Sequence, residues 1–417
     1  MNEIKANLIP DSPMDRTSNH VIKLLNSNKF CIDSHVHLFD IKCINKSYFT
    51  LRVLKDLLGL KSTTETYSNL SEQQAYDEIN NYQENWEDVF SEELELESST
   101  VIAPDTKGVI DIWHARKFLG FKTMKAVYNH YINDFSLGKV LNKDVIVTAL
   151  MMDLEIGWSV NIKKGVYEQV DELKELSNNF PVLPFLFCDP RRNMLIELFN
   201  YAFCGDKPFF GVKIYPALGY DPSDFRLWSI YEICEKKKIP ILTHCGGETI
   251  STAKTELDIY QGQNKIELKC KNRKEVAYEL NNPERWRTVL EKFPNLKLNF
   301  AHFGGYETWK RPSPVDYKGQ KRKEVIFEFM RTYNNVYSDF SYNLIEVDLS
   351  KNLREVLSTH NDILNKSLFG TDYWVVNKED NLLKAQEEFL RELDRNVKGI
   401  KMSDIVAIEN PKKYLFD

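Results

Sequence analysis

Eight short runs rich in β-branched and aromatic residues recur along the chain, and each is followed by a helical pattern. Within residues 225–237, for example, Leu227, Ile230 and Cys234 share one face at the helical period. Strands that alternate with helices indicate parallel βαβ units, and eight such units predict an α/β fold closed into a (β/α)8 TIM barrel. The eight runs are 30–32, 145–149, 182–187, 210–215, 239–243, 296–301, 336–340 and 367–370.

A doubly wound open sheet is the alternative fold. In its nucleotide-binding forms it carries a glycine-rich phosphate loop, and neither GxGxxG nor GxxxxGK[ST] occurs in the chain. A length of 417 residues leaves the domain count open. No linker rich in Pro, Gly and Ser marks a boundary, so we expect residues 1–417 to form a single barrel domain.

Two intervals between the expected strands are too long for simple connections. Residues 44–144 follow the first strand and are mostly helical in pattern, whereas residues 245–282 follow the fifth strand as a long loop. Both would leave the carboxyl-end face of a barrel, and we expect both to cap the site there. Residues 61–100 hold eleven acidic residues and one lysine. We interpret this stretch as a solvated helical face, with a docking surface as the alternative.

Composition and charge exclude several classes of protein. The net charge is −6, and outside the acidic stretch it is only +4, so nucleic-acid binding is not expected. No apolar run is long enough to span a membrane, and the polar start lacks the apolar segment of a signal peptide. The seven cysteines show no CxxC pair, which argues against a disulfide framework. We expect a cytoplasmic protein that binds neither membranes nor nucleic acids and that forms a homodimer.

Histidines gather at the carboxyl ends of the expected strands. His35 and His37 end the first strand on one face, because alternate residues of a strand point the same way. Residues at the carboxyl ends of different barrel strands converge on the face where such folds place catalysis. Neutral imidazoles and carboxylates bind divalent cations, so this pattern predicts a metal centre. The other members are His244 after the fifth strand, His302 after the sixth and Asp372 after the eighth.

A single buried histidine is usually a hydrogen-bonded core residue, and it is the shared position of these side chains that favours metal ligation. Asp33 is expected to be structural and to hold a ligand histidine from the barrel floor. Cys245 is expected to pack rather than to ligate. The remaining histidines are interpreted as structural or surface residues, with substrate contact left open for His114; they are His20, His114, His130 and His360.

The ordered strand-end motifs resemble the amidohydrolase superfamily, specifically its amidohydrolase-related branch. The motifs are DxHxH at 33–37, GVKIYP at 211–216, THCGG at 243–247, AHFGG at 301–305, NVYSDFS at 335–341, LFGTD at 368–372 and ENPKKYLF at 409–416. The resemblance covers residues 30–43 and about 145–417. It implies that His35, His37, His244 and Asp372 bind metal and that Asp372 accepts the proton of the attacking water. His302 would orient this water or polarise substrate in a mononuclear relative, and would bind the second metal in a binuclear one.

Lys213 distinguishes these two versions. VKIYPA is similar to the strand of dihydroorotases, whose lysine is carboxylated and bridges two metal ions. The alternative is a plain lysine that binds a substrate carboxylate or forms an ion pair. Tyr215 shares a face with Lys213, and Arg191 and Arg192 follow the third strand. These three residues are expected to recognise an anionic or carbonyl group of the substrate, with ordinary polar residues at the barrel rim as the alternative.

The sequence thus predicts a metal-dependent hydrolase that acts on an amide, ester or lactone bond of a small molecule. The expected cofactor is a divalent metal, Zn first, with one or two ions per chain. The expected catalytic residues are Asp372, His302 and Lys213. The alternatives are a metal-dependent nonoxidative decarboxylase on the same barrel and a noncatalytic binding protein. A binding protein would have lost metal ligands, and none is missing.

Overall fold

The structure of the chain is a computed structural model that describes most of the barrel. The described residues are 3–27, 29–43, 120–158, 162–206, 208–247, 250–309, 321–341, 347–373, 382–394, 399 and 401–417. The acidic stretch 61–100 and His114 therefore lie outside the described residues. Of the expected insertion 44–144, the part from residue 120 is described and is mainly helical.

Eight parallel strands form one sheet, and each pairs with its neighbours in chain order. Backbone hydrogen bonds join the two outer strands: Ser34 N donates to Phe369 O (3.0 Å), and Asp372 N donates to His35 O (2.9 Å). The sheet therefore closes into the predicted (β/α)8 barrel. The strands are β1 Phe30–His37, β2 Asp144–Leu150, β3 Val182–Phe187, β4 Gly211–Ile214, β5 Ile241–Thr243, β8 Leu298–Phe300, β9 Val336–Asp339 and β10 Ser367–Leu368.

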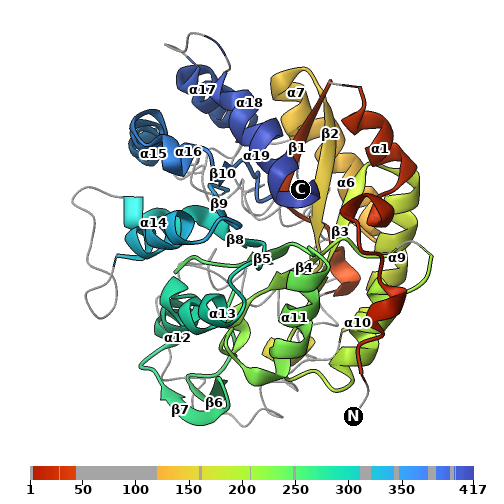
Figure 1. Ribbon diagram of the computed structural model, residues 1–417, viewed down its shortest axis with the longest axis vertical. Coiled ribbons are helices and arrows are strands. Elements are labelled where there is room, and N and C mark those ends of the chain that lie inside the picture. The colour runs from red at the N-terminus through yellow and green to blue at the C-terminus, as the bar shows by residue number, and fades with distance from the viewer. Residues whose placement is uncertain are drawn as a thin grey trace, which may run out of the picture.

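Helices surround these strands (Figure 1). They are α1 Asn19–Leu25, α6 Met124–His130, α7 Leu137–Leu141, α8 Glu155–Trp158, α9 Val166–Asn179, α10 Leu195–Phe203, α11 Trp228–Lys236, α12 Arg273–Leu280, α13 Arg287–Lys292, α14 Arg322–Thr332, α15 Val347–Thr359, α16 Asn361–Leu364, α17 Leu382–Leu393, α18 Met402–Asp404 and α19 Asn410–Phe416. The expected apolar face of α11 is buried, since Ile230 and Cys234 are inaccessible to solvent. Across the described residues, no helix has both the length and the apolar character that a membrane crossing requires.

Alternate apolar residues of the strands meet in the barrel interior as one cluster, which we call the barrel core. Helix α19 adds Tyr414 and Leu415 to this cluster. Tyr414 also donates a hydrogen bond to Ile241 O (2.8 Å) at the amino end of β5. The barrel core consists of Val21, Phe30, Ile32, Ile146, Leu150, Leu183, Phe185, Phe210, Leu242, Ala301, Tyr337, Leu368, Tyr414 and Leu415.

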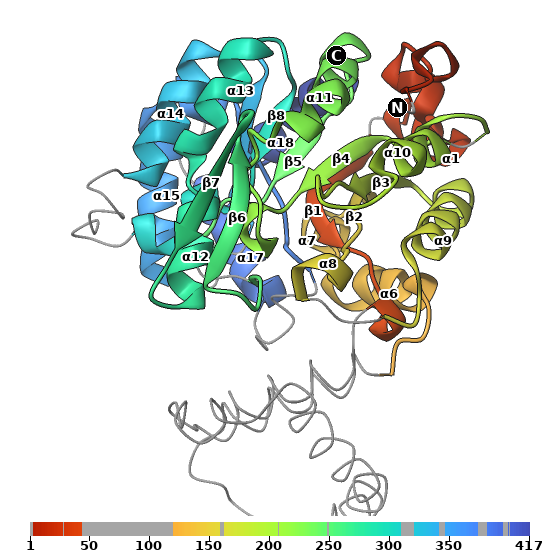
Figure 2. The same cartoon turned by 90° about the horizontal axis from the view of Figure 1, so that it is seen from below.

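The interval after β5 is more ordered than the expected long loop. It contains an antiparallel hairpin of β6 Glu256–Gln261 and β7 Asn264–Lys269, followed by α12. Figure 2 shows the hairpin standing beside α12. Leu257 and Ile259 of β6 are buried against Val276 and Leu280 of α12, because the strand alternates apolar and charged residues. This small separate core fixes the hairpin to the barrel.

Candidate metal centre

A β-bulge in β1 directs both histidines of the DxHxH motif into the barrel. The pairing of β1 with β2 shifts by one residue between Asp33 and Val36. Ile32, before the shift, belongs to the barrel core. Strict alternation from Ile32 would bring Val36 inward rather than the histidines, and one extra residue reverses this pattern. The bulge thus lets one strand contribute apolar residues to the barrel core and His35 and His37 to the site above it.

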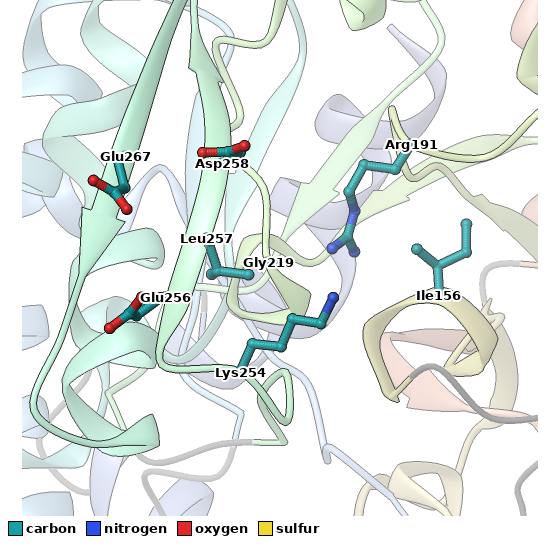
Figure 3. A pocket seen from close by; sticks show the side chains of 8 residues that line it. All are labelled: Ile156, Arg191, Gly219, Lys254, Glu256, Leu257, Asp258 and Glu267. Atoms are coloured by element: carbon teal, nitrogen blue, oxygen red, sulfur yellow. The ribbon is translucent and has the colours of Figure 1, made fainter.

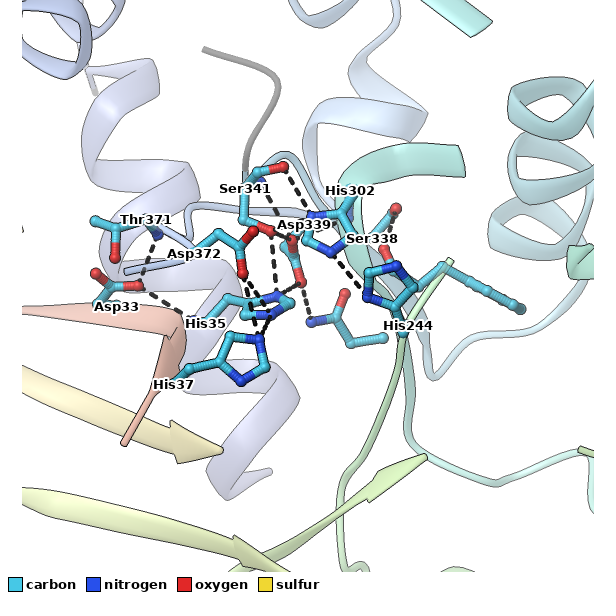
Figure 4. Close-up of polar contacts among 12 residues, drawn as sticks. Asp33, His35, His37, His244, His302, Ser338, Asp339, Ser341, Thr371 and Asp372 are labelled. Atoms are coloured by element: carbon cyan, nitrogen blue, oxygen red, sulfur yellow. Dashed lines mark hydrogen bonds and ion pairs between the residues drawn. The ribbon is translucent and has the colours of Figure 1, made fainter. Parts of the chain in front are cut away.

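Three donor atoms from the first and last strands lie at nearly equal distances. His35 Nε2 and His37 Nε2 are 3.3 Å apart. Asp372 Oδ1 lies 3.2 Å from the first nitrogen and 3.4 Å from the second (Figure 4). Ligand bonds of about 2.0–2.1 Å in tetrahedral geometry separate donor atoms by about 3.3–3.4 Å. The three side chains, which are all buried, fit the coordination of one divalent ion.

His244 and His302 form a second pair beside this triangle. His244 Nδ1 and His302 Nε2 are 3.2 Å apart. The other ring nitrogen of His244, Nε2, has no hydrogen-bond partner among the described residues although it is buried. Tyr215 stacks on the His244 ring with centroids 4.2 Å apart, which holds the ring in place. The pair offers two nitrogen donors to a second ion.

The backbone is strained at two of these strand ends. Asp372 has φ 53°, and His302 and Phe303 have φ 62° and 46°. The left-handed region costs a residue other than glycine about 1–2 kcal/mol. Strain of this kind persists where the surrounding structure enforces it, and it concentrates at functional sites. Here it occurs at two of the residues that the sequence predicts as ligands.

Lys213 is fully buried among these donors. Its Nζ has no hydrogen-bond partner among the described residues, and the ring centroid of Tyr215 lies 5.4 Å away. Burial lowers the pKa of Lys213 to about 7. A charged ammonium here also lowers the pKa of all four histidines of the centre, so it lies within electrostatic range of each.

The ionisation of the donors suits cation binding. The largest effect on each of the four histidines is burial, which lowers its pKa and favours the neutral ring with a free lone pair. Burial raises the pKa of Asp372, although His302 and His35 oppose this shift. A divalent cation would stabilise the carboxylate and replace the missing polar partners of the buried nitrogens.

Asp339 and Ser341 belong to the site and were missed by the sequence analysis. Asp339 Oδ2 lies 3.2 Å from His35 Nδ1, and Ser341 O lies 3.0 Å from His302 Nδ1. Asp339 ends β9, as the predicted ligands end their strands, and this shared position was the available signal. Burial alone would raise the pKa of Asp339, but His35 and His302 outweigh it and hold that pKa well below its usual range.

The predicted role of Asp33 is wrong in one respect. Its Oδ1 accepts hydrogen bonds from the backbone nitrogens of His35 (3.2 Å) and Thr371 (3.0 Å), and its Oδ2 accepts from Tyr131 Oη (2.6 Å). The contact with His35 is therefore to the backbone and not to the ring. Asp33 precedes the register shift and alternates with the inward-pointing Ile32, and Asp339 contacts the ring instead.

The other described histidines, His20, His130 and His360, belong to neither group of donors. His20 and His360 are exposed. His130 is buried, and its Nδ1 forms a hydrogen bond with the hydroxyl of Tyr373. Cys245 is buried and packs as expected, with Sγ 3.4 Å from Asn281 O.

The two predicted substrate-binding arginines each bind acidic side chains. Arg191 forms a bidentate pair with Asp189, with Nε–Oδ1 and Nη2–Oδ2 distances of 2.9 and 2.6 Å. Arg192 donates to Asp153 (2.7 Å) and Glu155 (2.9 Å). Tyr215 is the predicted substrate-binding residue that contacts the metal centre, through its stacking on His244.

A hollow of about 410 Å³ lies next to the hairpin (Figure 3). Arg191 lines it, but none of the described residues of the metal centre does. Its charges are mixed, and Asp258 and Glu267 pair with lysines of β7. The full lining is Ile156, Arg191, Gly219, Lys254, Glu256, Leu257, Asp258 and Glu267.

Comparisons with known proteins give one family match. Residues 200–399 match the sequence model of a family described as Amidohydrolase. No curated protein matches the chain in sequence.

Three solved structures that align with the chain have low identity to it. A Pseudomonas putida protein named provisionally as 2-pyrone-4,6-dicarboxylic acid hydrolase is 10% identical over 92% of this chain and 97% of its own, with a TM-score of 0.44. The 5-carboxyvanillate decarboxylase of Novosphingobium aromaticivorans, solved with manganese, is 12% identical over 74% and 92%, with a TM-score of 0.43. An amidohydrolase of Burkholderia multivorans with bound zinc is 10% identical over 71% and 96%, with a TM-score of 0.42.

The stretch that matches the family model includes most of the centre. It contains Lys213, His244, His302 and Asp372, whereas the two histidines of β1 lie before it. The match confirms the resemblance that the ordered strand-end motifs carry. The family that residues 200–399 match is thus the one that the motifs resemble.

Proposed function

We propose that this chain is a metal-dependent hydrolase that uses an activated water on an amide, ester or lactone bond of a small molecule. The observation that carries the proposal is the triangle of His35 Nε2, His37 Nε2 and Asp372 Oδ1, whose edges of 3.2–3.4 Å suit one divalent ion. A bound ion, Zn first, would lower the pKa of water toward ~7 and polarise the carbonyl of the substrate.

Asp372 is the proposed general base. Its carboxylate is buried at the end of β10, and burial raises its pKa, which makes it a better proton acceptor near neutral pH. The hydrogen bond from Asp372 N to His35 O holds the backbone that carries this carboxylate, which lies beside His35 and His37. Asp372 accepts a proton from the attacking water and returns it to the leaving group, so a single carboxylate acts first as base and then as acid.

Lys213 is the proposed bridge of a binuclear centre. Burial favours the neutral amine, which is the form that adds to carbon dioxide. In this step a bond forms between Nζ and the carbon of carbon dioxide, and one proton leaves, so the product is an anionic carbamate. An ammonium at this position would repel two divalent ions, whereas a carbamate would attract both. His244 and His302 would then bind the second ion.

The mononuclear alternative keeps the same first ion. Lys213 would remain unmodified, and His302 would orient the water or polarise the substrate. The Lys213→Ala variant distinguishes the two versions. In the binuclear version the metal content falls from about two ions to about one per chain, and short carboxylic acids partly restore metal and kcat. One ion per chain in the wild type, under bicarbonate-containing and metal-replete conditions, would leave the mononuclear version.

Hydrolysis is preferred over nonoxidative decarboxylation because of the arginines. An arginine clamp on a substrate carboxylate would favour the decarboxylase, but Arg191 and Arg192 are already held by acidic side chains. A test is to incubate the zinc- or manganese-loaded protein with a panel of amides, esters, lactones and aromatic carboxylic acids. Hydrolysis products support the proposal, whereas release of carbon dioxide without bond hydrolysis would replace it with the decarboxylase.

A further inference from the structure

Asp339 and Ser341 lie between the two groups of metal donors (Figure 4). Asp339 is fully buried at the end of β9. Its Oδ2 accepts from Asn299 Nδ2 (2.8 Å) and lies 3.2 Å from His35 Nδ1. Its Oδ1 accepts from the Ser341 hydroxyl and from the backbone nitrogen of His302 (3.2 Å). One carboxylate thus contacts a residue from each donor group.

The partners of the two Nδ1 atoms determine where each ring carries its proton. A neutral imidazole has one N–H, and a carboxylate or a carbonyl oxygen only accepts. His35 Nδ1 faces Asp339 Oδ2, so this nitrogen donates and Nε2 keeps its lone pair. His302 Nδ1 faces Ser341 O at 3.0 Å, so it donates too and leaves the lone pair on Nε2. In both rings the nitrogen that carries the lone pair is the one that faces the other donors.

The Ser341 hydroxyl connects the two rings. Its Oγ lies 3.1 Å from His35 Nδ1 and 3.0 Å from His302 Nδ1, and it donates its own proton to Asp339. The bond from His302 N to Asp339 also holds a residue whose φ of 62° is unfavourable. Asp339 and Ser341 therefore orient the ring of His35 in the first donor group. In the second group they hold both the ring and the backbone of His302.

We propose that Asp339 and Ser341 act as one positioning pair that sets the tautomer and orientation of both His35 and His302, so that the two donor groups are coupled through a single buried carboxylate. This inference rests on the proposed metal centre and adds two residues outside the proposed ligand set. Partners of this kind typically change metal affinity about 10- to 100-fold when they are removed.

Asp339→Asn tests the pair with almost no change in shape. The amide nitrogen of asparagine would donate toward His35 Nδ1, which would move the ring proton to Nε2 and remove the lone pair from the donor triangle. Protein labelled with 15N-histidine and freed of metal reports each tautomer by two-bond 1H–15N correlation. We expect Nδ1–H on His35 and His302 in the wild type, Nε2–H on His35 in the variant, and a Zn²⁺ affinity lower by about 10- to 100-fold.

Asp33→Asn is the matched control, because Asp33 is also a buried carboxylate but its hydrogen bond with His35 is to the backbone nitrogen and not to the ring. It should leave the His35 tautomer unchanged. Ser341→Ala should weaken Zn²⁺ binding relative to Ser338→Ala, since the Ser338 hydroxyl bonds only Phe300 O (2.6 Å). This second comparison keeps the test decisive if Asp339→Asn does not fold.

Either of two results would overturn the pair: Nε2–H on His35 in the metal-free wild type, or equal Zn²⁺ affinity in Ser341→Ala and Ser338→Ala. The tautomers are read without metal or substrate, so they test the positioning pair separately from the hydrolase. Predicted tautomers in a protein that hydrolyses nothing would leave the pair intact and reject the proposed function.

Discussion

The two ends of the barrel are filled in opposite ways. Toward the amino end, the barrel core brings apolar side chains together, and even the hydroxyl of Tyr414 has an acceptor. At the carboxyl end, His37 Nδ1, His244 Nε2 and Lys213 Nζ are buried without a hydrogen-bond partner among the described residues. A buried polar group left without a partner costs about 1–3 kcal/mol. The amino end therefore stabilises the fold, whereas the carboxyl end holds buried polar groups that a bound ion would stabilise.

Lys297 is an exception to this division within the described chain. It immediately precedes β8, and its buried Nζ also has no hydrogen-bond partner. Burial lowers the pKa of Lys297 to about 8, with Lys238 and Arg16 adding to the shift. Unlike Lys213, it precedes its strand rather than lying among the candidate ligands, and no described histidine contributes to its pKa shift.

Asp372→Asn should cause a severe loss of activity at the carboxyl end of the barrel. The amide oxygen still coordinates a cation but accepts no proton, so kcat should fall about 10²- to 10⁴-fold, the range of general acid–base catalysis. Metal content should remain close to that of the wild type, and His35→Ala should abolish turnover. Steady-state kinetics with metal analysis of the same sample check this. Near-normal kcat in Asp372→Asn would show that another group is the base.

Leu183→Ala should lower the stability of the fold and leave the activity almost unchanged. Leu183 is buried in the barrel core, and removing a buried leucine side chain costs about 2–5 kcal/mol. Urea unfolding should show this loss, while kcat per folded molecule stays within about twofold of the wild type. A large loss of kcat with unchanged stability would mean that the two ends are not separate in function.

Lys213→Met should stabilise the metal-free protein, and the gain should depend on pH. The pKa of Lys213 is about 7 in the folded state, against an ordinary value of 10.5. Between these values the unfolded chain holds a proton that the folded chain lacks, so the destabilisation by Lys213 is largest below pH 7 and disappears as pH rises toward 10.5. Unfolding in carbonate-free buffer should show a gain of about 1–3 kcal/mol at about pH 6 and almost none at about pH 10. A gain that does not change with pH would indicate that Lys213 is uncharged throughout.

Tyr414→Phe should cause the smallest change in stability among these variants. It keeps the ring in the barrel core and removes the hydrogen bond to Ile241 O, which is worth about 0.5–1.5 kcal/mol. Thermal unfolding measures this loss, and kinetics should not change. A decrease in metal affinity would show that the amino end controls the site.

The sequence was sufficient for the strands and for the position of most candidate ligands at one end of the barrel, because both follow from periodic patterns. The alternation of strands and helices predicts the barrel, and closure of a barrel brings His244, His302 and Asp372 to one face. The bulge at Asp33 was not predictable, since it depends on the register between β1 and β2. Because the sequence analysis did not include this bulge, its placement of Asp33 was wrong.

Side-chain partners from distant parts of the chain could not be predicted in the same way. Asp339 and His35 are separated by 304 residues, and only the closed barrel brings them together. The pair of Arg191 with Asp189, in contrast, is local and recognisable in the sequence DPRR. The hairpin after β5 has alternating apolar residues, but the apolar surface that it covers on α12 is known only from the structure.

The central claim is that the carboxyl end of the barrel is a metal centre, and anomalous scattering from crystals grown with Zn²⁺ and bicarbonate tests it most directly. The account predicts one anomalous peak bound by His35, His37 and Asp372, a second at His244 and His302, and extra density on Lys213 Nζ. A single peak at the first position with unmodified lysine would establish the mononuclear centre. No peak at the five side chains under metal-replete conditions would contradict the account.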